Sequence, residues 1–129
     1  MERIRFIEHR GRRILFMDFS EMNGPGEALA ELERARRVIA AEPRDSLLTL
    51  TDVTGTRYDD EIIKAFQALA AHNKPFVRAA ASVTRTPLQL VALRASAVLS
   101  RRKLEAFDDL EAAREWLVAQ DPAAGTARD

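Results

Sequence analysis

Residues 46 to 73 read SLLTLTDVTGTRYDDEIIKAFQALAAHN, and this stretch decides the fold class. Its aliphatic and β-branched start, Leu47–Thr51, predicts a buried strand, and the polar run that follows predicts a loop. From Asp59 to His72, apolar residues recur at the i, i+4 and i+7 spacing of an amphipathic helix. Strand, loop and helix in this order form the repeating unit of an α/β sheet, which meets ligands and partners at the carboxyl ends of its strands.

The same alternation of strand and helix extends in both directions along the chain. Four further strands are predicted at residues 4–8, 14–19, 76–83 and 103–107. Further helices are predicted at residues 27–42, from Thr86 onward, and from Asp108, which forms a capping box with Glu111. The sequence therefore predicts an α/β fold, a single mixed, mostly parallel five-stranded sheet with four helices and an N-terminal β-hairpin. We expect residues 1–120 to form one domain and residues 121–129 to form a flexible C-terminal tail.

The amino-acid composition of the chain argues against several classes of function. The 129 residues carry 20 Lys or Arg and 20 Asp or Glu, so the net charge is zero, which argues against a general affinity for nucleic acid. The absence of cysteine excludes disulfides and thiolate metal sites and fits a reducing cytoplasm. No apolar run approaches the roughly 20 residues that span a bilayer. We expect a cytoplasmic protein that is not an integral membrane protein.

Two loops at the carboxyl end of the predicted sheet supply candidate binding residues. Because 52–58 and 84–86 each follow a parallel strand, we expect them to form a functional rim. Arg57 and Arg85 could hold an anion in bidentate fashion, although Thr86 is equally explained as a helix cap. The candidate rim residues are Asp52, Thr54, Thr56, Arg57, Tyr58, Arg85 and Thr86.

Carboxylates near the same edge have two interpretations. Asp18 and Asp52 each end a strand and could hold Mg²⁺ or share a proton, but aspartate also orders turns by accepting backbone N–H bonds, and we favour that role. Asp59, Asp60 and Glu61 could mimic a phosphorylated residue, yet carboxylates are common in the first turn of a helix. We therefore interpret all five as structural.

The helix predicted from Thr86 has two apolar faces. One carries a core stripe, and on the opposite face Leu90, Leu93 and Ala97 form a candidate interaction surface. A homodimer through this surface is one interpretation, and burial of both faces by the chain's own loops is the other. Beneath this helix we expect the Ala-rich strand 77–83, whose small side chains could leave room for an apolar ligand or let the helix sit close.

The two histidines, His9 and His72, have no nucleophile nearby in sequence and no HExxH-type spacing. We expect no catalytic residue, no metal site and no cofactor. Tyr58 and Trp116, each the only residue of its type, are interpreted as packing residues.

In the order and spacing of its predicted strands and helices, the chain resembles the sulfate-transporter and anti-sigma-factor-antagonist (STAS) superfamily and the related CRAL-TRIO-like lipid-binding proteins. The resemblance spans about residues 2–119 and is closest to small stand-alone bacterial members of unassigned function. The stretches that carry it are ILFMDFS (14–20), SLLTLTDVT (46–54), HNKPF (72–76) and FDDLEAAREWL (107–117).

The antagonists of this superfamily present a phosphorylatable Ser or Thr at the start of the helix after the third strand, where added charge breaks a complex. This chain carries Asp59, Asp60 and Glu61 there, so that switch residue is not carried over. The resemblance implies a non-catalytic regulatory module that acts by protein–protein interaction and is not an enzyme. The alternative is a carrier or sensor of a small apolar or lipid-like ligand.

Overall fold

The computed structural model of the protein describes residues 3–22, 24–55, 60–87, 91 and 104–120. The strands are β1 (Ile4–His9), β2 (Arg12–Asp18), β3 (Leu47–Asp52), β4 (Val77–Val83) and β5 (Leu104–Phe107), and the helices are α1 (Pro25–Ala40), α2 (Asp60–Asn73) and α4 (Leu110–Ala119). The described part of the chain thus holds three helices, where the sequence predicted four. Most of the missing one, predicted from Thr86, lies outside the described residues, as does the predicted tail at 121–129.

The five strands form one mixed sheet in the order β1-β2-β3-β4-β5. β1 pairs with β2 antiparallel, and every other pair is parallel, as predicted. Arg10 and Gly11 join β1 to β2 with φ angles of 52° and 77°. Positive φ at both central residues is the geometry of the type I′ turn, which suits the twist of a hairpin.

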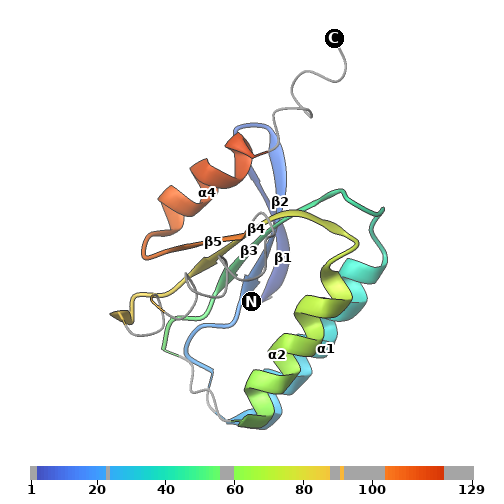
Figure 1. Ribbon diagram of the computed structural model, residues 1–129, viewed down its shortest axis with the longest axis vertical. Helices are drawn as coiled ribbons and strands as arrows, with labels where there is room; N and C mark the ends of the chain where they lie inside the picture. Colours follow the sequence, from blue (N-terminus) through green and yellow to red (C-terminus); the bar gives the residue numbers. More distant parts are fainter. Residues whose placement is uncertain (1–2, 23, 56–59, 88–90, 92–103, 121–129) are drawn as a thin grey trace.

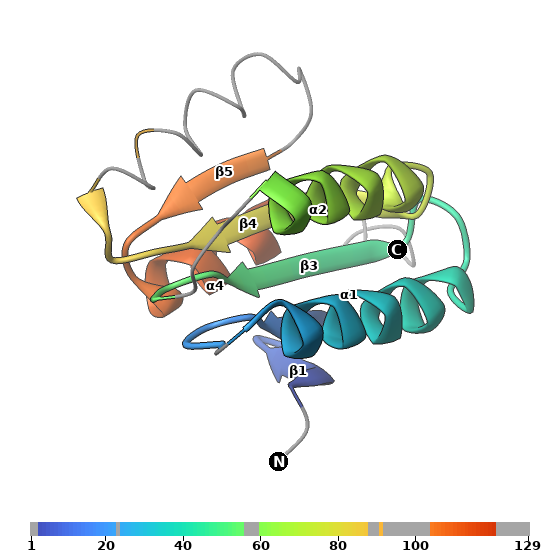
Figure 2. The same cartoon turned by 90° about the horizontal axis from the view of Figure 1, so that it is seen from below.

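The helices cover the sheet on both faces. Figures 1 and 2 show α1 and α2 side by side on one face and α4 on the other. Successive parallel strands step in one direction across the sheet, and right-handed crossovers therefore place α1 and α2 on the same face.

The face under α1 and α2 carries the larger aliphatic core. The apolar stripe of α1 is confirmed, because Ala28, Leu32, Ala35 and Ile39 are all buried against Leu15, Met17 and Leu47 of the sheet and their neighbours. Phe66 of α2 meets the ring of Phe19 edge-on, with ring centroids 5.3 Å apart. These contacts hold both helices flat on the sheet.

The opposite face is built from smaller side chains. Ala79, Ala81 and Val83 of β4 are fully buried in one cluster with Ala113 and Leu117 of α4. Ala79 and Ala81 therefore lie beneath α4, while the helix predicted to cover this strand lies outside the described residues. Their small side chains let α4 approach the sheet closely.

The first turn of α4 differs from the prediction by one residue. Asp109, not Asp108, is the cap: its carboxylate accepts a hydrogen bond from the backbone N–H of Ala112 at 2.8 Å. Adjacent aspartates make this position ambiguous in sequence, and the extended backbone of Asp109 decides it. None of the helices in the described part of the chain is both long enough and apolar enough to span a membrane.

Candidate functional site

The carboxyl ends of the central strands are aligned, as the sequence predicts. Asp18 pairs with Asp52, Asp52 with Val83, and Val83 with Phe107 across the four parallel strands. The pairing continues into the loops, where Phe19 N–H donates to Asp52 O at 2.8 Å and Val53 N–H to Val83 O at 2.9 Å. The hydrogen-bonded pairing of the sheet therefore extends to the first residue of each loop at this edge.

Three side chains at this edge order the loops in the same way. Asp18 Oδ1 accepts the backbone N–H of Ser20 and Asp52 Oδ1 accepts that of Thr54, both at 3.0 Å. Thr84 Oγ1 accepts the N–H of Thr86 at 3.2 Å. In each case an oxygen bonds the backbone two residues on, which is the turn geometry these residues favour. This geometry is the structural role that we favoured for Asp18 and Asp52.

The side chain of Arg3 also lies at the carboxyl end of β2, beside Asp18. Its Nη1 donates to the carbonyl oxygens of Asp18 and Ser20 at 3.0 and 2.8 Å and lies 3.7 Å from the Asp18 carboxylate. Its Nη2 lies 3.4 Å from the carboxylate of Glu27 at the start of α1. The guanidinium thus links the β2 end to α1, and Asp18 is part of an ion-pair network.

Glu21 and Gly55 bring two of the loops into contact. Glu21 N–H donates to Thr54 O at 2.9 Å, and Gly55 has a φ of 76°. A Cβ atom built on Gly55 would collide with the carboxylate of Glu21, so the glycine permits a close approach of the two loops.

The rim is brought together in part. Asp52 is buried, Thr54 is half-buried, and Arg85 and Thr86 are exposed at the same edge of the sheet. The other rim candidates, Thr56, Arg57 and Tyr58, lie outside the described residues, as does the proposed helix surface of Leu90, Leu93 and Ala97. Anion binding by the arginines and dimerisation through that helix stay predictions.

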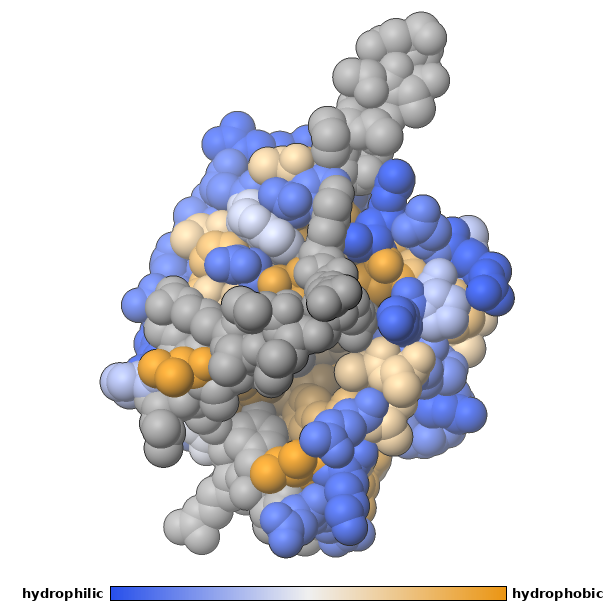
Figure 3. All heavy atoms as spheres, viewed as in Figure 1, coloured by the Kyte–Doolittle hydropathy of each residue, from blue (hydrophilic) through white to orange (hydrophobic). Residues whose placement is uncertain are grey.

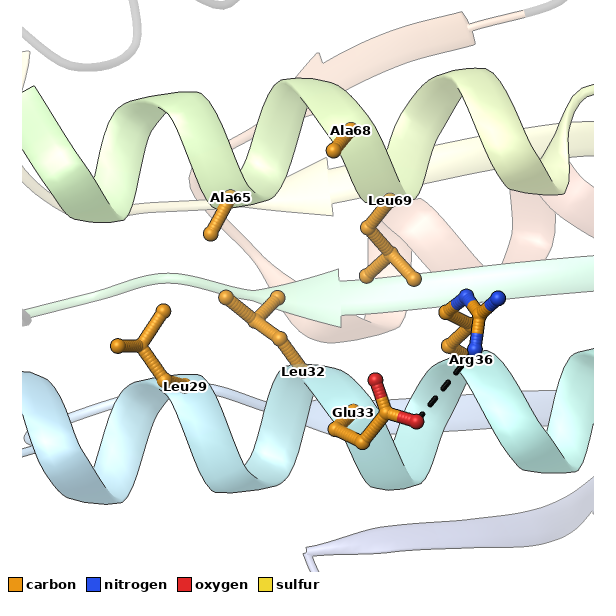
Figure 4. A pocket seen from close by; sticks show the side chains of 7 residues that line it. All are labelled: Leu29, Leu32, Glu33, Arg36, Ala65, Ala68 and Leu69. Carbon is orange, nitrogen blue, oxygen red and sulfur yellow. Dashed lines mark hydrogen bonds and ion pairs between the residues drawn. The ribbon is translucent and has the colours of Figure 1, made fainter.

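A hollow that the sequence did not predict lies on the outer side of the α1–α2 layer. Its volume is about 230 Å³. Figure 4 shows its lining residues on the two facing helices: Leu29, Leu32, Glu33 and Arg36 of α1, and Ala65, Ala68 and Leu69 of α2. Leu32 and Leu69 are buried and form an apolar floor, while Glu33 and Arg36 make an ion pair at 3.4 Å beside it. The only indication of this hollow in the sequence was Leu29, an apolar residue that flanks the core stripe of α1.

Elsewhere the visible surface is mostly polar. Figure 3 shows hydrophilic side chains over most of the described part of the face it draws, with apolar side chains in small separate patches. Among the described residues, Ile63 of α2 is 42% exposed and Val91 is 64% exposed. Scattered exposed apolar residues are normal, so the α1–α2 hollow is a better-formed apolar feature than either.

This architecture is a STAS-like α/β fold, which confirms the resemblance at the level of the fold. A similar solved structure is that of an uncharacterised DUF3478-family protein with a SpoIIAA-like fold from Shewanella loihica PV-4. The TM-score is 0.73 at 15% sequence identity, and the match covers 88% of this chain and 91% of the other. No protein-family model and no curated protein sequence matches this chain.

Proposed function

We propose that the protein is a non-catalytic regulatory module that binds an amphipathic helix of a partner protein in the hollow between α1 and α2. The observation that carries the proposal is the apolar floor of this hollow, formed by Leu32 and Leu69 between two helices that lie side by side. Laying the apolar face of a helix into a groove is a common mode of peptide recognition.

The hollow is small, and its size favours a side chain of a partner protein over a complete small-molecule ligand as its occupant. Pockets for small molecules measure roughly 300–1,000 Å³ and enclose most of the ligand. At about 230 Å³ and open to solvent, the hollow has room for one or two large apolar side chains. Glu33 and Arg36 supply a charge of each sign beside the floor, which matches the polar rim of a protein interface.

The hydrogen bonds of the polar side chains at the carboxyl edge of the sheet support a non-catalytic role for the protein. Asp18 and Asp52, the carboxylates best placed for chemistry at the sheet edge, each accept a backbone hydrogen bond that orders a loop. Thr84 uses its hydroxyl oxygen in the same way. These contacts give all three side chains a structural role that needs no catalytic explanation.

A displayed library of amphipathic helical peptides tests the docking site. We expect the wild-type protein to select peptides that Ala68→Glu, which places a carboxylate in the hollow, binds at least about tenfold more weakly. Ala70→Glu is the matched control, since Ala70 is also an exposed alanine of α2 but does not line the hollow. Both variants should keep the wild-type circular dichroism spectrum.

Two results would overturn the docking site. One is a library that yields no binder, and the other is a set of selected peptides that Ala68→Glu and the wild type bind equally well. Amide chemical shifts of the labelled protein locate the contact directly. Shifts confined to the rim would move the binding surface to the ends of the strands.

A carrier of a small apolar ligand is the second candidate function, and one observation favours it. A smaller hollow of about 160 Å³ lies between the sheet and α4, lined by Ile7, Phe16, Leu50, Leu110, Arg5 and Arg114. This hollow is also below the size of pockets for drug-sized ligands, but an apolar cavity of roughly 150 Å³ can hold a single benzene ring, and the guanidinium groups of Arg5 and Arg114 would attract a carboxylate. Benzoate titrated into the protein should shift the methyl resonances of Ile7, Leu50 and Leu110, and an unchanged spectrum would remove this candidate.

A further inference from the structure

A histidine and two glutamates converge where the β1–β2 hairpin meets α4 (Figure 1). His9 ends β1, and Glu111 and Glu115 lie one helical turn apart on α4. The Nε2 atom of His9 lies 2.9 Å from Oε2 of Glu115 and 4.0 Å from Oε2 of Glu111. One ligand atom from each of the three side chains lies within 4.8 Å of the other two.

Two arginines orient the carboxylates of this cluster. Arg114 Nη2 donates to Oε1 of Glu111 at 2.9 Å, which leaves Oε2 of that glutamate on the His9 side. Arg10 Nε donates to both oxygens of Glu115, at 2.8 and 2.9 Å. Of the two glutamates, only Glu111 matches the pattern of a metal ligand, because an outer hydrogen bond to one of its oxygens fixes the direction of the lone pair on the other.

We propose that His9, Glu111 and Glu115 bind a divalent transition-metal ion of the zinc type. One imidazole nitrogen and two carboxylate oxygens are ligands that Zn²⁺ accepts, and three protein ligands leave a fourth position open. Mg²⁺ and Ca²⁺ fit this donor set poorly, since both prefer oxygen ligands alone. The ion would fasten the hairpin turn to α4.

The geometry needs only side-chain adjustment to accept the ion. Zinc–ligand distances of roughly 2.0–2.2 Å place the ligand atoms of a tetrahedral site about 3.4 Å apart. The His9–Glu115 distance of 2.9 Å must therefore lengthen by about 0.5 Å, and Glu111, whose side chain is 58% exposed, must approach His9 by a similar amount from 4.0 Å. Because Nε2 of His9 donates to the Glu115 carboxylate in the cluster, metal binding must displace the Nε2 proton and leave His9 as the neutral tautomer protonated on Nδ1.

The groups around Glu115 favour its ionised form. Hydrogen bonds from His9 and then Arg10 are the largest causes that lower the pKa of Glu115. Arg10 also competes with a metal ion, because its guanidinium contacts the same Oε2 atom that faces His9. Metal binding therefore requires Arg10 to move away from that oxygen. Removing the guanidinium should strengthen metal binding.

Titration of the tag-free protein with Zn²⁺ by calorimetry tests the site, and Co²⁺ provides a visible absorption signal for tetrahedral coordination. We expect one ion per chain. His9→Gln and Glu111→Gln should each weaken Zn²⁺ binding by at least about tenfold. Arg10→Gln should strengthen binding severalfold, because it removes the competing cation.

His72→Gln is the matched control, since His72 is the other histidine of the chain and pairs with Asn73 on α2. Its Zn²⁺ affinity should equal that of the wild type. The proposal is overturned if the wild type binds neither Zn²⁺ nor Co²⁺, if His72→Gln weakens binding as much as His9→Gln, or if Arg10→Gln weakens it. Circular dichroism confirms that each variant is folded before it is titrated.

Discussion

At the level of single residues, the ends of three neighbouring strands share one structural role, which is carried by Asp18, Asp52 and Thr84. Each directs a side-chain oxygen to the backbone N–H two residues on, and so bends the chain out of the sheet. Of these three residues Asp52 is the one that belongs to the candidate rim, and its side chain is buried. Its role as a turn former has a direct test.

Asp52→Asn should leave stability nearly unchanged, whereas Asp52→Ala should lower the free energy of unfolding by about 1–2 kcal/mol. The reason is that an asparagine side-chain oxygen also accepts the N–H of Thr54, while alanine leaves that partly buried donor without its partner. Urea denaturation of both variants measures the difference. Equal losses for Asn and Ala would show that the charge of Asp52, and not its turn, is what the fold requires.

Residues whose role is local could be predicted from sequence, and residues whose role depends on distant partners could not. Asp52 ends β3 and Thr54 follows two residues later, so their place at the edge of the sheet could be predicted from the sequence. Glu111 and Glu115 share a face of α4, but the contact between His9 and Glu115 joins residues 106 positions apart. Only the docking of α4 against the hairpin brings them together.

At the scale of elements, the amphipathic pattern located the helices well and their ends less well. The stripe of α1 identified its buried face, because only that face can meet the sheet. The α1–α2 hollow could not be predicted in the same way, since it depends on how far apart the two helices sit. Two small residues of α2, Ala65 and Ala68, keep it open opposite Leu29.

The cap of α4 provides the prediction at this scale. Asp109→Ala should destabilise the protein by about 1 kcal/mol, because it removes the acceptor for the N–H of Ala112. Asp108→Ala, one residue earlier, is the control and should stay within about 0.5 kcal/mol of the wild type. Thermal unfolding followed by circular dichroism compares them. A larger loss for Asp108→Ala would restore the cap that the sequence suggested.

At the scale of the whole molecule, one sheet separates two cores of different character. Larger aliphatic and aromatic side chains fill the space under α1 and α2, and alanines fill much of the space under α4. Both proposed ligand sites at α4, the Zn²⁺ site and the small hollow, lie on the α4 side of the sheet, whereas the proposed helix-binding hollow lies on the other side. Whether the two sides can communicate depends on whether they unfold as one unit.

We predict that they do, because β2 and β3 contribute buried residues to both cores: Leu15 and Leu47 face α1 and α2, while Ile14 and Leu50 face α4. Leu32→Ala removes a buried side chain of α1 and should cost about 2–5 kcal/mol. The lone Trp116 lies on the opposite side, in α4, with its ring centroid 5.8 Å from that of Phe107. Its fluorescence therefore reports unfolding of the α4 face.

If the two cores form one cooperative unit, Leu32→Ala should lower the urea midpoint of Trp116 fluorescence by the same amount as that of far-ultraviolet circular dichroism. Leu117→Ala, which removes a fully buried side chain from the α4 core, is the reciprocal variant and should also move both midpoints together. A fluorescence midpoint that stays at the wild-type value in Leu32→Ala would contradict this prediction. The two faces would then unfold separately, and binding at one could not stabilise the other.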